Sequence, residues 1–276
     1  MYSNQEFSRR FRIALAELAK TPQLLGFDNG VHEDRGGGLR LSGIGDCARR
    51  QYFKVVLADT FAAVEAEADG ATYWAPWMGY AGQAIVAAVL TQMGYGIGAG
   101  EEQVVYGGIP GHIDGLMQGL DLGWKSVWDN KVRGPYMYRQ LATIGLPQAD
   151  PQMYYQMQGY MGGTGSNLAI ITIVPHDFSE NRNQIERYIK EEPRPDPLVT
   201  RLVVKRDMIA QKRLQERGAM LRIAIANRQL VAREFDPEKD RFPCPYCEFL
   251  KICTLRGQTD DFVVPPVIWN EDLDVT

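Results

Sequence analysis

The chain has 276 residues, of which 45% are hydrophobic and 23% charged, the composition of an ordinary globular protein with ample core. Its formal net charge of −4 at pH 7 excludes a basic protein that coats nucleic acid without specificity. No apolar run approaches the roughly 18 residues that span a membrane, and the N-terminal stretch lacks the hydrophobic segment of a secretory signal. We therefore expect a cytoplasmic protein with no membrane partner.

The first part of the chain is expected to be helical on both sides of a glycine-rich connector. Residues 1–20 have the spacing of an amphipathic helix, and residues 77–93 have that of a more apolar one. The connector over residues 31–46 is not followed by Gly-Lys-Ser or Gly-Lys-Thr, so a flexible loop fits it better than a phosphate cradle. Asp46 is placed to cap a helix that carries Cys47.

Short apolar runs between residues 102 and 174 predict the strands of one sheet. They cover residues 102–106, 109–117 and 124–132, followed by the continuous β-branched run 168–174, which is typical of a buried strand. A helix over residues 147–162, beginning near Asp150 and Pro151, separates the third run from the fourth. This order predicts an α/β fold with a central mixed sheet flanked by helices.

The C-terminal part is expected to be helical and then irregular. Residues 202–235 have the pattern of a long helix, with most of the basic residues between 201 and 217 on its solvated face. The last 18 residues contain five acidic residues and no basic one. We expect them to form a partly ordered tail that is available to a protein partner.

Two acidic residues and a lysine between residues 110 and 133 are the first candidate site. Asp129 and Lys131 are two apart on a predicted strand, so their side chains share a face, and Asp114 can reach the same place from the neighbouring strand. Two carboxylates beside an ammonium suit a hard divalent cation, Mg²⁺ or Mn²⁺, that activates water against a phosphodiester. An acid-x-Lys triplet alone also fits a solvated hairpin face, so the neighbouring motifs have to decide.

The four cysteines are the second candidate site. Cys244, Cys247 and Cys253 form a C-x2-C-x5-C cluster, and Cys47 lies far upstream. In a cytoplasmic protein such a cluster more often binds metal than forms disulfides. Four thiolates can hold either zinc or an iron–sulfur cluster. Either centre would join the first fifth of the chain to its last fifth.

Five motifs follow one another in a recognisable order. They are the Cys-Ala-Arg-Arg-Gln-Tyr run that starts at Cys47, the Gly-His-Ile-Asp run that ends at Asp114, the Asp-Asn-Lys triplet of residues 129–131, the pair Gln156 and Tyr160, and the C-terminal cysteines. Together they resemble the RecB-like branch of the PD-(D/E)XK nucleases, especially the fourth CRISPR-associated protein and its iron–sulfur relatives. The likeness covers roughly residues 41–253.

The resemblance implies a restriction-endonuclease-like nuclease core over residues 77–200. It also implies a helical subdomain formed by residues 1–76 and 201–258 and stapled by a [4Fe–4S] cluster, with residues 259–276 as the acidic tail. The implied cluster ligands are Cys47, Cys244, Cys247 and Cys253. The implied Mg²⁺ or Mn²⁺ site consists of Asp114, Asp129 and the backbone carbonyl of Asn130. Lys131 would be catalytic, and Gln156 and Tyr160 would position the lysine or the DNA strand.

Gln83 marks a departure from the family pattern. The family commonly has a histidine, sometimes a glutamate, as a further metal ligand on the helix before the strands, and here Gln83 takes that place. A neutral amide oxygen is a poorer ligand than imidazole for a transition metal. The choice between Mn²⁺ and Mg²⁺ therefore depends on what Gln83 does.

The resemblance implies a metal-dependent DNA exonuclease or end-processing nuclease that acts on single-stranded DNA or free ends in recombination, repair or phage DNA metabolism. The intact set of Asp114, Asp129 and Lys131 favours this function. The alternative is a non-catalytic or weakly active DNA-binding accessory protein with a purely structural metal cluster, which Gln83 and the acidic pI favour. Divalent-metal-dependent cleavage of DNA separates the two.

Overall fold

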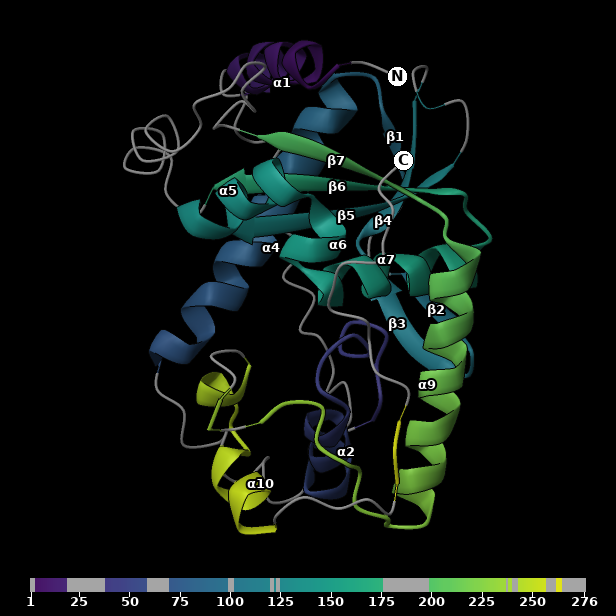
Figure 1. Cartoon of the computed structure of the whole chain (residues 1–276). Helices are drawn as coiled ribbons and strands as arrows, with labels where there is room; N and C mark the ends of the chain where they lie inside the picture. Colours follow the sequence, from purple (N-terminus) through teal and green to yellow (C-terminus); the bar gives the residue numbers. More distant parts are fainter. Residues whose placement is uncertain are drawn as a thin grey trace.

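The computed structural model describes residues 3–18, 38–58, 70–98, 102–119, 122, 125–175, 199–236, 238–239, 243–256 and 262–264. In this part of the chain a five-stranded sheet is flanked by helices (Figure 1). The helices are α1 (Asn4–Leu18), α2 (Ala48–Val56), α4 (Gly70–Gln92), α5 (Pro135–Ile144), α6 (Leu146–Ala149), α7 (Pro151–Thr164), α9 (Met208–Ala226), η2 (Cys244–Tyr246) and α10 (Leu250–Arg256). The strands are β1 (Gly96–Ile97), β2 (Glu102–Tyr106), β3 (Ile109–Ile113), β4 (Gly115–Gln118), β5 (Ser126–Arg133), β6 (Leu168–Pro175) and β7 (Thr200–Lys205).

The sheet is mixed, as the sequence predicts. Its strand order is β1-β4-β5-β6-β7, with β5 and β6 parallel and the other neighbouring pairs antiparallel. β2 and β3 pair as a separate antiparallel hairpin. β6 is buried from Ala169 to Pro175, because it lies inside the sheet with helices over both faces.

The two faces of the sheet carry separate apolar cores. Phe7 from α1, Val86 from α4 and Trp128 from β5 belong to the smaller core. Val127 belongs to the larger core, which α7 completes with Tyr160. Because successive residues of a strand point to opposite faces, Val127 and Trp128 enter different cores. Figure 1 shows α5, α6 and α7 on the side of the sheet away from α1.

The lower half of Figure 1 brings the two ends of the described chain together. Helix α2 packs there beside α10, and α9 runs down to it from the sheet. The ring centroids of Phe53 and Phe249 are 5.5 Å apart. The Arg50 guanidinium forms an ion pair of 2.8 Å with Glu248. The described N- and C-terminal segments therefore meet in one helical layer.

The expectation of a single strand over residues 109–117 is wrong at its centre. Asp114 is a bend between β3, which pairs with β2, and β4, which pairs with β5. The chain therefore changes from one sheet to the other at the predicted metal ligand. Apolar alternation does not reveal the bend, because it continues through Ile113, Gly115 and Met117 on both sides of it.

The helix predicted from residue 202 is wrong at both ends. Residues Thr200–Lys205 form β7, an edge strand that pairs with β6. Its Leu-Val-Val run favours a strand. Helix α9 begins only at Met208, where the Asp207 carboxylate accepts hydrogen bonds from Ile209 N (2.8 Å) and Ala210 N (3.0 Å). It ends at Ala226.

Three polar residues lie elsewhere than predicted. Arg201 and Arg217 are each only 2% exposed, although the basic residues of this region were expected on a solvated helix face. Asp46 does not cap α2, because the N-cap is Cys47 and Asp46 Oδ1 accepts a hydrogen bond from Cys47 N at 2.8 Å. Both arginines find partners inside the protein, which explains how their charge is tolerated there.

Two predicted domain boundaries fall inside elements of the sheet region. The boundary between residues 76 and 77 lies within α4, and that between residues 200 and 201 lies within β7. Most of the predicted acidic tail and residues 31–37 of the connector lie outside the described residues. Within the described part of the chain, no helix is long and apolar enough to cross a membrane.

Candidate active site and cysteine cavity

Asp114 and Asp129 approach each other because β4 pairs with β5. The register places Gly115 opposite Trp128, so the next residues along the two strands are Asp114 and Asp129. Asp114 Oδ2 accepts a hydrogen bond of 2.7 Å from Asn130 N. The bend after β3 thus fixes the Asp114 carboxylate against the backbone of β5, next to Asp129.

Asp129 and Lys131 share one face of β5, as their spacing predicts. Lys131 Nζ lies 2.5 Å from Asp129 Oδ2. The Asp129 side chain is 1% exposed, whereas the Lys131 side chain is 21% exposed. A buried carboxylate is costly without a compensating charge, and the Lys131 ammonium supplies that charge. Oδ2 accepts no hydrogen bond of regular geometry within the described residues, so the ion pair is its main contact.

Asn130 contributes its backbone to this site and its side chain to the other face. Its Oδ1 accepts a 2.9 Å hydrogen bond from Thr172 Oγ1, which in turn accepts one of 3.2 Å from Trp128 Nε1. In an extended strand the N–H and C=O of one residue point to the same side. The Asn130 N–H points to Asp114, so the Asn130 carbonyl is directed to the same side of β5. This carbonyl lies beyond Gly115, the last residue of β4 that pairs with β5.

The donor set fits a hard divalent cation. Two carboxylates from neighbouring strands meet a backbone carbonyl directed to the same side, and oxygen ligands of this kind suit Mg²⁺ or Mn²⁺. The residues that would hold the cation are Asp114, Asp129 and Asn130.

Gln156 and Tyr160 lie on α7 within the larger core. Gln156 Nε2 donates a 2.8 Å hydrogen bond to the Tyr160 hydroxyl, and both side chains are buried. A Cβ on Gly111 of β3 would lie only 2.7 Å from Tyr160 Cε1, so Tyr160 packs tightly on the hairpin. No hydrogen bond joins Gln156 to Lys131 among the described residues. The positioning role of this pair stays a prediction.

Gln83 lies on α4, and its helix covers the opposite face of the sheet. A Cβ on the adjacent Gly82 would lie 3.1 Å from Val132 Cγ2 and 3.7 Å from Asn130 Nδ2, side chains that point away from Asp129. No hydrogen bond joins Gln83 to Asp114 or Asp129 in the described part of the chain. The role of Gln83 at the metal stays a prediction.

Arg133 is a candidate residue that the sequence analysis missed. It follows Asp129 and Lys131 at the same two-residue spacing, so all three share one face of β5. Its Nη2 lies 3.2 Å from Asp150 Oδ2, while Asp150 Oδ1 caps α7 by accepting a 3.0 Å hydrogen bond from Met153 N. The alternation along β5 was the signal that could have identified it. Its partly exposed guanidinium thus pairs with Asp150 on the same face of β5 as Lys131.

The four cysteines converge on one cavity. Cys47, Cys244, Cys247 and Cys253 all line it, together with Arg49 and Phe53 from α2 and Phe249 between η2 and α10. All four cysteines are half-buried thiols outside any disulfide bond. The first and last fifths of the chain therefore meet at the cysteines.

The arrangement of thiols bears on the kind of metal centre. Among the described residues, no three His, Cys, Asp or Glu side chains are close enough together to ligate one metal ion. A zinc ion needs all its thiolates about 2.3 Å from one point. In an iron–sulfur cluster each thiolate binds a different iron atom, so the sulfurs stand further apart. The choice between zinc and an iron–sulfur cluster therefore stays a prediction.

The surroundings of the thiols are partly cationic. Arg49 is 1% exposed, and its Nη1 donates a hydrogen bond of 3.7 Å to Cys253 Sγ. Burial raises the pKa of Cys47 to about 12, and the carboxylates of Glu234 and Asp46 add to the shift. Burial raises the pKa of Cys247 as well. Burial therefore opposes ionisation of these two thiols, and a bound metal centre would offset that cost.

A buried ion pair secures the segment before Cys47, and the sequence analysis missed it. Arg217 on α9 donates to Glu234 Oε1 at 2.5 Å, to Ile44 O at 2.8 Å and to Asp46 O at 2.6 Å. Glu234 Oε2 accepts a further bond of 2.5 Å from Ala48 N. No local pattern indicates these contacts, because the partners are far apart in the sequence.

No protein-family model matches the sequence, and no curated protein matches it. Several solved structures resemble the fold. The chain resembles the protein SSO0001 with a TM-score of 0.44 and 14% identity, over 91% of this chain and 96% of that one. It resembles an alkaline exonuclease from Laribacter hongkongensis with a TM-score of 0.44 and 13% identity, over 71% of this chain and 93% of that one.

A phage-related exonuclease from Haemophilus somnus 129PT resembles the chain with a TM-score of 0.41 and 14% identity, over 69% of this chain and 92% of that one. At such low identities and TM-scores, these likenesses do not establish a family for the chain.

Proposed function

We propose that this protein is a divalent-metal-dependent nuclease that hydrolyses phosphodiester bonds of DNA. One observation carries the proposal: Asp114 and Asp129 converge from neighbouring strands beside Lys131, and Asp129 is buried against the lysine. A structural role alone does not require a charge at Asp129, because an apolar residue fills such a position at lower cost. Two carboxylates and an ammonium at one strand end are the groups that phosphodiester hydrolysis uses.

Each group has a defined task. Mg²⁺ or Mn²⁺, when bound, lowers the pKa of a water molecule and polarises the phosphate. Asp114 and Asp129 supply the negative charge that holds the cation, with the Asn130 carbonyl as a further ligand. Lys131 moves its ammonium from Asp129 towards the scissile phosphate and stabilises the negative charge that develops there. Arg133, at the same face, binds the neighbouring phosphate.

The proposed substrate is single-stranded DNA or DNA with free ends, as the family resemblance implies. The net charge of −4 does not conflict with this, because a nuclease needs only a local set of cations, here Lys131 and Arg133. In the accessory-protein alternative, Lys131 permanently neutralises Asp129 and no cleavage takes place. The ion pair of 2.5 Å between them is the observation that keeps this alternative open.

We further propose that the four cysteines hold a [4Fe–4S] cluster. Support comes from their meeting at one cavity and from the Arg49 guanidinium beside Cys253. Zinc is the alternative. The cluster would stabilise the helical layer by joining its two segments and would have no part in hydrolysis.

A time course of cleavage tests the proposed activity. End-labelled linear and circular single-stranded DNA are incubated with the full chain, with Mg²⁺, with Mn²⁺ and with EDTA. We expect metal-dependent loss of the linear substrate, and the products distinguish digestion from an end from internal cutting. DNA binding without any metal-dependent cleavage would refute the nuclease and establish the accessory function.

A further inference from the structure

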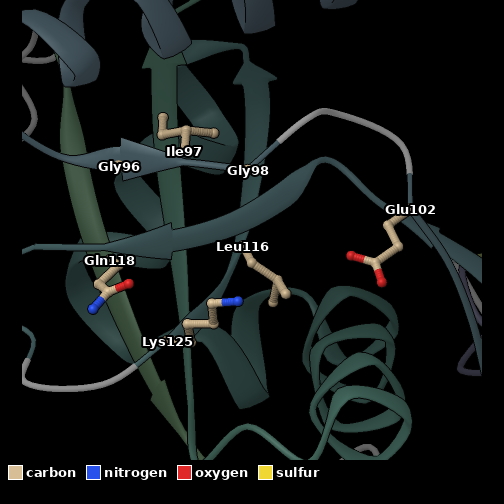
Figure 2. Close-up of a pocket in the computed structure, with 7 residues that line it drawn as sticks. All are labelled: Gly96, Ile97, Gly98, Glu102, Leu116, Gln118 and Lys125. Carbon is tan, nitrogen blue, oxygen red and sulfur yellow. The ribbon is translucent and has the colours of Figure 1, made fainter.

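A pocket of about 590 Å³ opens at the edge of the sheet formed by β1 and β4 (Figure 2). Its volume lies within the usual range of ligand sites, roughly 300–1,000 Å³. None of the residues proposed for metal binding or catalysis lines it. The lining residues are Gly96, Ile97, Gly98, Glu102, Leu116, Gln118 and Lys125.

The pocket lies on the same face of the sheet as the proposed active site. Leu116 is directly opposite Val127, and side chains opposite each other in an antiparallel pair share a face. Val127 and Asp129 are two apart on β5, so Leu116 and Asp129 share that face too. Leu116 is also two residues beyond Asp114, about 7 Å along the chain. The pocket therefore begins about one nucleotide away from the proposed scissile phosphate.

Two glycines leave the floor of the pocket open. Gly96 is opposite Gln118, and Gly98 N donates a 2.9 Å hydrogen bond to Leu116 O, so both lie on the pocket face of β1. A Cβ at Gly96 or Gly98 would come no closer than 3.8 Å and 3.6 Å to its nearest neighbour, which is ordinary contact. Neither glycine has a positive φ. Neither packing nor backbone conformation requires glycine at positions 96 and 98. A flat pocket floor does require glycine there, because glycine has no side chain.

The polar groups at the rim match a nucleobase better than a phosphate. Figure 2 shows Lys125 and Gln118 on one side and the Glu102 carboxylate pointing into the pocket from the other. Lys125 and Glu102 form no ion pair within the described residues. The carboxylate repels a phosphate, whereas an ammonium, an amide and a carboxylate together complement the donors and acceptors of a base edge.

We propose that this pocket binds one nucleobase of the DNA strand whose phosphate lies at Asp114 and Asp129, an inference that rests on the proposed function. The base stacks on the glycine floor beside Leu116, and Glu102 accepts a hydrogen bond from its exocyclic amino group. Thymine has no such amino group. The pocket therefore gives the protein a preference for cytosine, adenine or guanine over thymine at this position.

Binding of short fluorescent oligo-dC and oligo-dT to the full chain in EDTA, where no cleavage can occur, tests the pocket. We expect the wild type to bind oligo-dC more tightly. Gly98→Val fills the floor and should remove the preference, with oligo-dC affinity falling about fivefold or more. Gly38→Val is the matched control, because Gly38 is exposed and a Cβ there would meet nothing within 4 Å.

The exposed side chain of Gln118 offers a second test that does not depend on filling the floor, since Gln118→Leu should also weaken oligo-dC binding. An unchanged ratio of oligo-dC to oligo-dT affinity in folded Gly98→Val and in Gln118→Leu overturns the pocket. Cleavage by the wild type is measured separately. Cleavage with unchanged ratios refutes the pocket and leaves the nuclease standing, whereas altered ratios without cleavage support the pocket and refute the nuclease.

Discussion

Asp129 is the residue on which the proposed function depends most. A carboxylate that is 1% exposed loses its hydration, and a single ammonium at 2.5 Å replaces only part of it. The pairing of β4 with β5 places the Asp129 carboxylate next to Asp114, the residue before β4. A binding site for a cation explains both features, whereas packing explains neither.

Replacement of Asp129 by asparagine should abolish metal-dependent cleavage while the protein stays folded. The substitution keeps the shape of the side chain and removes the charge that holds the cation. Rates on end-labelled DNA, with circular dichroism as the folding control, provide the measurement. Folded Asp129→Asn with near-wild-type turnover would show that the site is elsewhere.

Lys131→Met should have two separable effects. Cleavage should be lost because the ammonium no longer stabilises the phosphate, and the free energy of unfolding should fall because Asp129 remains buried without its partner. Lys212→Met is the control, since Lys212 is a 79% exposed lysine of α9. Denaturant unfolding and end-labelled cleavage measure the two effects. A fully active Lys131→Met would refute the catalytic role of the lysine.

Gln83→His tests whether α4 contributes to the metal site. If Gln83 faces the cation from the end of the sheet, an imidazole there should raise the Mn²⁺-supported rate relative to the Mg²⁺-supported one. Metal titrations of wild type and variant give the ratio. An unchanged ratio would mean that Gln83 only packs beside the sheet face opposite Asp129.

At the residue scale, the sequence predicts groups that are close in the chain or lie at regular strand spacing. Asp129 and Lys131 follow from alternation, and Asp114 follows once two strands pair. The ion pair between Arg217 and Glu234 was not predicted, because its contacts join segments that are distant in sequence. Such contacts depend on how α9 and the following loop pack, and no local pattern encodes that.

The elements of the sheet were predicted better than the breaks between them. The β-branched run of β6 and the Asp150–Pro151 start of α7 are strong local signals, and the structure confirms both. The bend at Asp114 and the strand β7 were missed. Both are decided by pairing with another strand, since β4 turns away from β3 to meet β5, and β7 completes the sheet beside β6.

Asp150 has two roles at the N-terminus of α7. Asp150 caps the helix through Met153 N and also pairs with Arg133. Asp150→Ala should reduce the free energy of unfolding by about 1 kcal/mol through the lost cap. Asp150→Asn keeps a capping oxygen and should lose less. Urea unfolding of both variants measures the difference, and equal losses would show that the ion pair rather than the cap is responsible.

The described part of the molecule consists of a sheet region and a helical layer in which the N- and C-terminal segments meet. Polar and aromatic contacts already join these ends: Arg50 pairs with Glu248, Phe53 packs on Phe249, and Arg49 Nε donates to Val231 O at 2.6 Å. The cysteine cavity lies among these contacts. A metal centre there would therefore add to a partly preformed interface.

A metal centre in the cysteine cavity should stabilise the N- and C-terminal segments together. Cys47→Ala should remove one ligand and make amide hydrogen exchange faster in both α2 and α10, while β5 and β6 keep their protection, because the binding energy of the centre stabilises the two segments together. Wild-type protein purified without oxygen should be brown if the centre is an iron–sulfur cluster. Colourless protein with one zinc per chain would refute the cluster but keep the joint stabilisation. Faster exchange in α2 alone would refute the joint stabilisation itself, because a shared centre has to loosen both segments when it is lost.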